Sequence, residues 1–435
     1  MEIVCVAGTS RARARLARLA ARGGEPGDAI ERRVRRIVAA VRRHGDRALL
    51  AFTRRLDGVV LTPRRLRVPP EALAAAYRAL PAAVRRDLVL AARRIRAFHR
   101  RQRERSWLVR DAAGARLGQR VVPLERVGIY VPGGRAAYPS TVLMTAIPAR
   151  VAGVRTVIAV SPAGADGPPP AVLAACHVAR VDALYRVGGA QAVAALAYGT
   201  ATVPRVDKVV GPGNVWVTAA KRLCFGAVGI DGLAGPSEVA VVADGSADPE
   251  LVAADMLAQA EHDPRAAAIC LTPDRRLAAR VAAALDRQLA TLPRRAIAAR
   301  ALAAFGAIVV VRSLAEAIAL ADRLAPEHLE LAVRRPRRLA AAVRHAGAIF
   351  LGQGAPEAFG DYLAGPSHVL PTGGTARFAS PLGVYDFVKR TSVIEAAPRT
   401  LARLGPAVVR LARLEGLDAH GRAVERRLAR LEGGR

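Results

Sequence analysis

Lysine and asparagine are nearly missing from this chain. It holds three Lys against 64 Arg, one Asn, and only 4% aromatic residues, and its formal net charge is +31. Such a charge can indicate a nucleic-acid or polyanion partner. The arginines, however, are spread over many expected helices, with few aromatic residues among them to stack on bases. We therefore interpret the charge as compositional drift in a chain rich in Ala, Gly and Pro, and we expect no specific nucleic-acid partner.

Cysteines and long apolar runs are also scarce. The four cysteines are far apart and form no Cys-x-x-Cys pair, which excludes a disulfide framework and a thiolate zinc site (Cys5, Cys176, Cys224, Cys270). No apolar run reaches the roughly 18 residues of a membrane span. The brief apolar stretch at the start precedes the first arginines, which is the reverse of a secretory signal. We expect a reduced, cytoplasmic protein without a membrane partner.

Hydrophobic periodicity predicts an α/β fold. Val34, Ile37, Val38 and Val41 follow helical spacing within residues 31–54, and helical patterns continue to about residue 105. Short β-branched runs then alternate with helical stretches such as 190–197, which is typical of parallel sheets. The expected strands are 127–131, 156–160, 208–210, 239–242, 267–271, 307–311 and 348–351. From about residue 397 the pattern is helical again, with an interruption at Gly416.

Three glycine turns follow expected strands: Gly128–Gly134, Gly188–Gln191 and Gly211–Asn214, which contains the only Asn. Such turns let backbone N–H groups approach a phosphate or a ring closely. None is a Gly-x-Gly-x-x-Gly fingerprint, and each alone is more typical of a structural turn. Together, at the ends of successive strands, they suit the crevice where α/β sheets bind ligands.

Gln259 and His262 are candidate metal ligands, because i, i+3 spacing would place them on one helix face. Zinc needs about four N, O or S donors. The remaining candidates occur in glycine-flanked, non-helical contexts: Asp361, His368 and His420. Alone, His262 is more typical of a histidine on a helix surface.

Glu327 and His328 are adjacent in the segment Pro326–Glu330. An acid and an imidazole together can serve two proton transfers in one site. The segment fits a helix start equally well, with Pro326 at the first position and Glu327 near the positive helix end. Both interpretations remain open from spacing alone.

Nine segments together resemble the histidinol dehydrogenase family. They occur in the family's order over nearly the whole chain, most strongly over residues 120–395: VGIYVPGG, YPSTVLMTAIPARVAGV, VGGAQAVAALAYGT, VDKVVGPGNVWVTAAKR, IDGLAGPSEV, LAQAEHDP, PEHLEL, GDYLAGPSHVLPTGGTARF and DFVKRTSV. The resemblance implies oxidation of L-histidinol to L-histidine through L-histidinaldehyde with two NAD+, the last step of histidine biosynthesis.

The resemblance also implies roles for single residues. The zinc ligands would be Gln259, His262, Asp361 and His420, an N/O donor set that would also admit manganese or cobalt. These four and His328 would also contact the substrate. Glu327 and His328 would be the acid–base pair. Further substrate contacts would be Ser237, His368 and Glu415, and NAD would contact Tyr130, Gln191 and Asn214. Family members are intertwined homodimers, so Glu415 and His420 would act in the partner's site.

The expected architecture is two incomplete Rossmann-like parallel-sheet domains with small helical segments at both ends. We expect a helical segment at 1–30, a first α/β domain from 31–127 with 238–384, a second at 128–237 on the NAD side, and a helical segment at 385–435. Two alternatives remain: a sister dehydrogenase of the same fold acting on another small alcohol, such as a sulfonated diol, and a non-catalytic, polyanion-binding protein. The second predicts broken ligand or acid–base positions, and none is broken.

Overall fold

The computed structural model describes residues 4–22, 27–133, 137–162, 164 and 166–432. These residues form two compact units. The first contains residues 1–102 and 124–387, and the second contains residues 103–123 and 388–435. Gly134, the last residue of the first glycine turn, lies outside the described residues, as do parts of the expected 1–30 segment.

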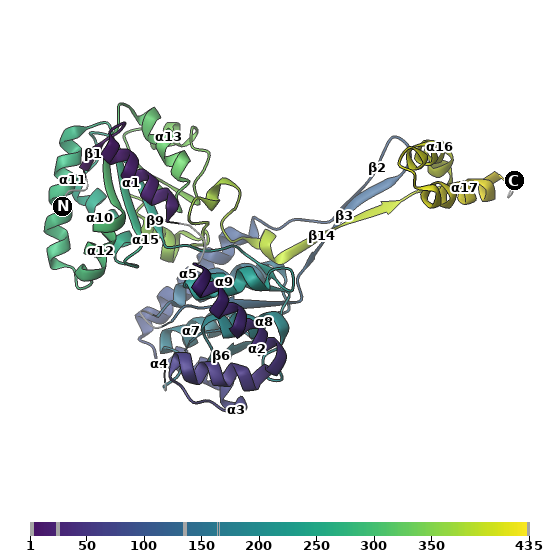
Figure 1. The fold of residues 1–435 in the computed structure, drawn as a ribbon, viewed down its shortest axis with the longest axis horizontal. Helices are drawn as coiled ribbons and strands as arrows, with labels where there is room; N and C mark the ends of the chain where they lie inside the picture. The colour runs from purple at the N-terminus through teal and green to yellow at the C-terminus, as the bar shows by residue number, and fades with distance from the viewer. Residues whose placement is uncertain (1–3, 23–26, 134–136, 163, 165, 433–435) are drawn as a thin grey trace. The chain divides into compact units, whose positions relative to one another are not determined.

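The first unit contains a six-stranded parallel sheet in the order β1-β11-β10-β9-β12-β13. Its strands are β1 (Val4–Val6), β9 (Glu238–Ala243), β10 (Ala267–Thr272), β11 (Gly306–Val310), β12 (His328–Ala332) and β13 (Ala348–Leu351). One face packs on α10 (Pro249–Ala260), α11 (Arg275–Thr291) and α12 (Arg295–Phe305). The other packs on α1 (Ser10–Ala21) and α13 (Leu314–Leu324) (Figure 1). The short elements are α14 (Pro336–Ala340), α15 (Glu357–Phe359) and a π-helical turn, η2 (Gly360–Ala364).

A second parallel sheet in the same unit has the order β6-β5-β4-β7-β8. Its strands are β4 (Arg126–Tyr130), β5 (Thr156–Val160), β6 (Ala183–Tyr185), β7 (Lys208–Val210) and β8 (Gly229–Ile230). The helices α2 (Asp28–Phe52), α8 (Gly189–Tyr198) and α9 (Val215–Cys224) cover one face. The helices α5 (Ala82–Arg100), α6 (Pro139–Ala152) and α7 (Pro170–Ala179) cover the other. Around these lie η1 (Thr53–Asp57), α3 (Pro63–Leu66), α4 (Pro70–Ala79) and η4 (Val384–Phe387). The short helix η3 (Thr375–Arg377) lies beside α13, where Arg377 donates to the carbonyl of Arg323.

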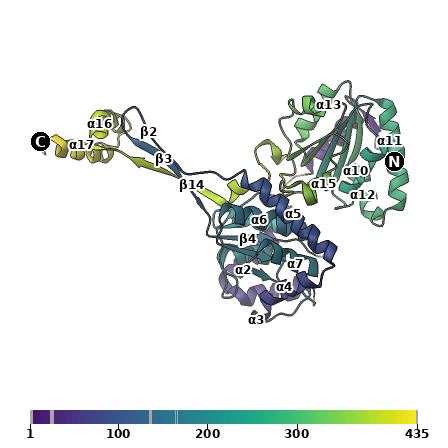
Figure 2. The same cartoon turned by 180° about the vertical axis from the view of Figure 1, so that it is seen from behind.

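The second unit is a three-stranded antiparallel ribbon followed by two helices (Figure 2). Its strands are β2 (Trp107–Arg110), β3 (Arg116–Pro123) and β14 (Val388–Glu395), with β3 in the centre. The helices α16 (Pro398–Leu414) and α17 (Asp418–Glu432) pack on each other, with Gly405 against Val424 and Leu428.

The α/β class with two parallel sheets is confirmed, and each predicted strand matches an observed one to within a residue or two. The four cysteines are buried and unpaired, as expected. Within the described residues, no helix has the length and apolar character required to cross a membrane.

The division of the chain differs from the expectation in three places. The helices of residues 28–100 cover the five-stranded sheet rather than the six-stranded sheet of residues 238–384, because the apolar face of α2 meets α8 and α9. The 1–30 segment is not only helical, since β1 pairs with β11 in the six-stranded sheet. The segment 385–435 includes β14, which pairs with β3 along eight residues. The helix start at Pro326 is also wrong, because His328 begins the buried strand β12.

Candidate active site

Glu327 and His328 lie beside Glu238 at the amino-terminal end of the strands of the six-stranded sheet. Glu238 is the first residue of β9, His328 is the first residue of β12, and the two strands are neighbours. Because α10 runs back from the carboxyl end of β9, it ends near the amino-terminal end of the strands, with Gln259 in its last turn. His262 follows two residues after the helix end. The course of α10 therefore brings both candidate ligands to the end of the sheet that holds the candidate acid–base pair, Glu327 and His328.

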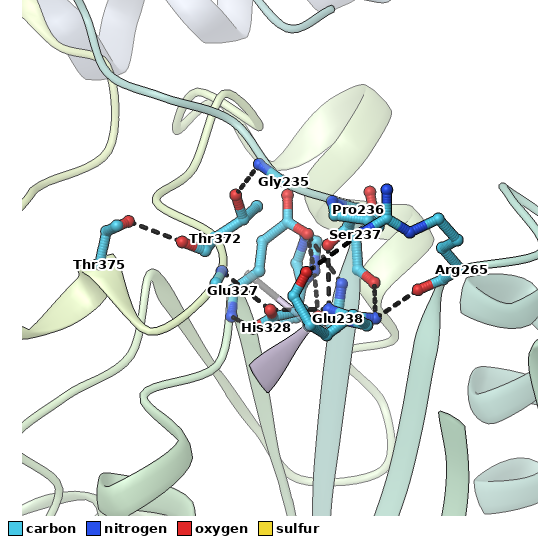
Figure 3. A network of polar contacts seen from close by, with 11 residues as sticks. Gly235, Pro236, Ser237, Glu238, Arg265, Glu327, His328, Thr372 and Thr375 are labelled. Carbon is cyan, nitrogen blue, oxygen red and sulfur yellow. Dashed lines mark hydrogen bonds and ion pairs between the residues drawn. The ribbon is translucent and has the colours of Figure 1, made fainter. Parts of the chain in front are cut away.

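The backbone of Glu238 binds both members of the pair (Figure 3). Its N–H donates to Oε2 of Glu327 at 2.9 Å, and its carbonyl lies 3.0 Å from Nδ1 of His328. A carbonyl only accepts, so Nδ1 carries the proton and Nε2 keeps the lone pair of a base. In return, Oε2 of Glu238 accepts from the backbone N–H of Glu327 at 3.3 Å.

Burial sets the protonation of this pair. Burial lowers the pKa of His328 to about 4, against a weaker opposing effect of Asp361. The ring is therefore neutral near pH 7 and can accept a proton. Burial, reinforced by repulsion from Glu238, raises the pKa of Glu327 well above its usual range. The site thus pairs a neutral base with a carboxyl group that holds its proton more tightly than an exposed one.

A group of candidate metal ligands lies beside the pair. One donor atom each from His262, Glu357 and Asp361 lie within 4.8 Å of one another. Oε1 of Glu357 is also 3.9 Å from Nδ1 of His328. Gln259 is fully buried next to Glu357. In one orientation its amide nitrogen donates to Oε2 of Glu357 at 2.9 Å; in the other its oxygen faces the carboxylate oxygens, an arrangement that suits a cation. The N/O donor set fits zinc.

A cavity of about 580 Å³ lies at the carboxyl ends of the five-stranded sheet. Tyr130 is the last residue of β4, Gln191 lies in the first turn of α8 after β6, and Asn214 follows β7; all three line the cavity. The strand order reverses at β4, so this is the switch point at which open parallel sheets bind ligands. The hydroxyl of Tyr130 accepts from the N–H of Gly189 at 3.0 Å, and burial raises its pKa to about 12.

Comparison with known proteins identifies the family to which this chain belongs. The family model described as histidinol dehydrogenase matches residues 21–428. The chain belongs to the histidinol dehydrogenase family. The histidinol dehydrogenase of Syntrophotalea carbinolica is 57% identical over 95% of this chain and 96% of its own. That of a Synechococcus strain is 54% identical over 92% and 93%. The crystal structure of histidinol dehydrogenase from Elizabethkingia anophelis superposes with a TM-score of 0.93 at 34% identity, covering 99% of this chain and 98% of that one. The chain is therefore a dehydrogenase, and the resemblance seen in its sequence is confirmed.

Besides lining the cavity, Asn214 caps the amino-terminal end of α9. Its Oδ1 accepts from the N–H groups of Trp216 and Val217 at the start of α9, at 3.0 and 3.2 Å. Gly211, which begins the same turn, has a φ of +108°, and a Cβ there would lie 2.4 Å from the carbonyl oxygen of Tyr130. Glycine is therefore required at this position. The lone asparagine serves the geometry of the turn as well as lining the cavity.

Of two further candidate residues, His368 lies beside Asp361 and Ser237 lies beside Glu238. Nδ1 of His368 is 3.1 Å from the carbonyl and 3.8 Å from Oδ1 of Asp361, while its Nε2 lies 3.4 Å from Thr141 Oγ1. Ser237 directly precedes Glu238 and is partly buried. Glu415 and His420 belong to the second unit, where both are exposed.

Sequence reasoning missed several buried residues of the site. Glu238 and Glu357 are 8% and 3% exposed, and each lies within hydrogen-bond or ion-pair distance of a candidate residue. Asp57 lines the cavity and accepts from Nε2 of Gln191 at 3.2 Å, and burial raises its pKa. The one sequence signal for these partners is Glu238, a carboxylate directly before the apolar run Val239–Val242, because a buried charge without a partner is costly.

Proposed function

We propose that this protein is a zinc-dependent L-histidinol dehydrogenase that forms L-histidine through L-histidinaldehyde with two NAD+. The observation that carries the proposal is identity of more than half over nearly the full length of relatives with that name, with Glu327 and His328 buried side by side. The product makes this the last step of histidine biosynthesis, and we place the enzyme in the cytoplasm.

Gln259, His262 and Asp361 are the proposed zinc ligands of one chain, and His420 the fourth. Their nitrogen and oxygen donors match zinc chemistry, and the proximity of His262, Glu357 and Asp361 supports the site. Bound zinc would hold the substrate through its nitrogen donors, which is positioning more than activation. Ser237, His368 and Glu415 would complete the substrate contacts.

His328 is the proposed base for the alcohol proton. Its ring is neutral and its Nδ1 is engaged by Glu238, so Nε2 is the free acceptor. Glu327 is the proposed group that activates water for the aldehyde step, where it must first lose its proton. This division requires no thiol nucleophile, and the four cysteines are buried.

The cavity lined by Tyr130, Gln191 and Asn214 is the proposed NAD site. Gln191 is fully buried, and its Oε1 has no hydrogen-bond partner among the described residues. A buried acceptor without a partner is costly, and a donor from a ligand would satisfy it. NAD+ supplies the hydride acceptor for both oxidation steps.

We further propose a homodimer in which Glu415 and His420 serve the partner's site. The second unit carries many large apolar side chains that are at least two-fifths exposed: Trp107, Leu108, Val109, Ile394, Leu404, Val408, Leu411, Leu414 and Leu417. Surfaces of this kind mark protein interfaces. A dimer that shares residues would make the purified monomer inactive and poor in zinc.

The decisive experiment measures NADH formed per L-histidinol consumed, first with zinc and then after chelation. Two NADH per substrate, lost on chelation and restored by zinc, support the proposal. Turnover of another small alcohol, such as a sulfonated diol, with none of histidinol would assign the sister activity. Polyanion binding without any NADH formation would favour the non-catalytic alternative.

A further inference from the structure

Arg22 is the buried residue that ties the N-terminal helix to the acid–base pair. It caps the C-terminal end of α1, and its side chain is 1% exposed. Its guanidinium donates to four oxygens: the carbonyls of Pro236, Ser237 and Arg265 at 3.0, 3.1 and 2.7 Å, and Oε1 of Glu238 at 2.7 Å. Three of these four acceptors belong to the residues that enter β9.

Glu238 passes this restraint on to the reacting groups. Its carboxylate accepts from Arg22, from the N–H of Gly373 at 2.8 Å and from the N–H of Glu327. Its backbone N–H and carbonyl hold Glu327 and His328, as Figure 3 shows. A shift of the 236–238 backbone would therefore move the Glu327 carboxylate and free Nδ1 of His328 together.

We propose that Arg22 and Glu238 are positioning residues for the acid–base pair, with Arg22 fixing the backbone that sets the tautomer of His328. Neither needs to touch the substrate. Arg22 suits this task because the planar guanidinium of an arginine can bind several carbonyls in a fixed geometry. The inference rests on the proposed roles of Glu327 and His328.

The chain offers a matched control on the same helix. Arg15 also anchors α1 by donating to backbone carbonyls, those of Gly306, Leu302 and Ala303 at 2.5, 3.1 and 3.1 Å. Those carbonyls lie at the end of α12 and the start of β11. Arg15 is only partly buried, but Arg15→Met still removes a second arginine that anchors α1 through three backbone carbonyls, without touching residues 236–238.

The experiment compares full-length Arg22→Met, Arg22→Lys and Arg15→Met with the wild type. The measurements are kcat, the KM for NAD+, zinc per chain, thermal stability, and the ¹⁵N resonances of the His328 ring, assigned with His328→Asn. For Arg22→Met we expect kcat to fall about 10- to 100-fold, since losing a residue that orients a reacting group, or displacing that group by about 1 Å, has effects of that size. The KM for NAD+ and the zinc content should not change, and the Nδ1 resonance should lose its fixed protonated state.

Arg22→Lys should recover part of kcat, because one ammonium can still reach some of the carbonyls. Arg15→Met should lower thermal stability and leave both kcat and the His328 resonances at wild-type values. Wild-type kcat in Arg22→Met, or an equal loss of kcat in Arg15→Met, would overturn the inference. If the wild type does not oxidise histidinol, the proposed function fails, while the His328 resonances still decide the role of Arg22.

Discussion

Lys221→Met should destabilise the protein strongly and raise its KM for NAD+. Lys221 is one of three lysines in a chain of 64 arginines, and its side chain is 3% exposed. Its Nζ donates to Oδ1 of Asp231 and, at 3.1 Å, to the carbonyl of Gly211. Asp231 in turn accepts from the N–H groups of Gly211 and Gly232 at 2.6 and 2.8 Å. The buried pair thus fixes the start of the turn that ends in Asn214.

The magnitude follows from burial. Removing one partner of a buried ion pair leaves an uncompensated charge and costs about 3–5 kcal/mol, whereas removing both charges costs much less. Lys221→Met should therefore lose about 3–5 kcal/mol in urea unfolding, and adding Asp231→Asn should recover about half of the loss. The KM for NAD+ should rise more than kcat falls, because the displaced turn lines the proposed NAD cavity.

Lys208→Met is the matched control. Lys208 pairs with Asp386, but both side chains are partly exposed, at 16% and 19%, so its loss should cost only about 1 kcal/mol. A loss below about 1 kcal/mol for Lys221→Met, or a double variant no more stable than the single one, would refute the reasoning from buried charge.

Three other substitutions test the site, and a fourth tests Glu330, a buried carboxyl group within β12. Glu327→Gln should slow oxidation of the aldehyde more than that of the alcohol, measured by supplying each substrate separately; equal losses would contradict the division of roles. His328→Asn should lower turnover strongly at normal zinc content, and unchanged turnover would remove His328 from the reaction. Asp361→Asn should lose zinc on dialysis, so full retention would argue against its role as a ligand. Burial and repulsion from Asp255 raise the pKa of Glu330 to about 9, so unfolding releases its proton, and its contribution to stability falls as pH rises from about 4.5 to 9. In Glu330→Gln, the free energy of unfolding in urea should therefore fall less steeply between pH 6 and pH 8.5 than in the wild type. An unchanged slope would contradict the raised pKa.

The two parallel sheets could be predicted because their strands are buried on both faces. Such strands appear in the sequence as continuous apolar runs, as at 239–242 and 267–271, and each is separated from the next by a helical pattern. The ribbon of the second unit gives no such signal. All four residues of β2 are exposed, and β14 is exposed at nearly every position.

The assignment of helices to sheets could not be predicted. The spacing of Val34, Ile37 and Val41 predicts an apolar helix face but carries no information on which sheet that face will cover. Similarly, β1 has three residues and pairs with residues 308–310, so nothing local specifies it. The buried partners Arg22 and Glu357 share this difficulty, since their contacts lie far away in the sequence.

The position of Glu327 and His328, the proposed acid–base pair, explains why the sequence did not indicate their buried partners. Ligands of open parallel sheets usually bind at the carboxyl ends of the strands, and the cavity with Tyr130 and Asn214 obeys that rule. Glu327 and His328 lie instead where β12 begins, beside the first residue of β9. At the amino-terminal end of the strands, some backbone N–H groups have no partner in the β-sheet hydrogen bonding, and carboxylates can accept from them. Glu238 and Glu327 do so reciprocally, since each carboxylate accepts from the backbone N–H of the other residue. The same exchange that stabilises the two buried acids also fixes them against each other, and the proposed role of Glu327 requires such a fixed carboxyl group.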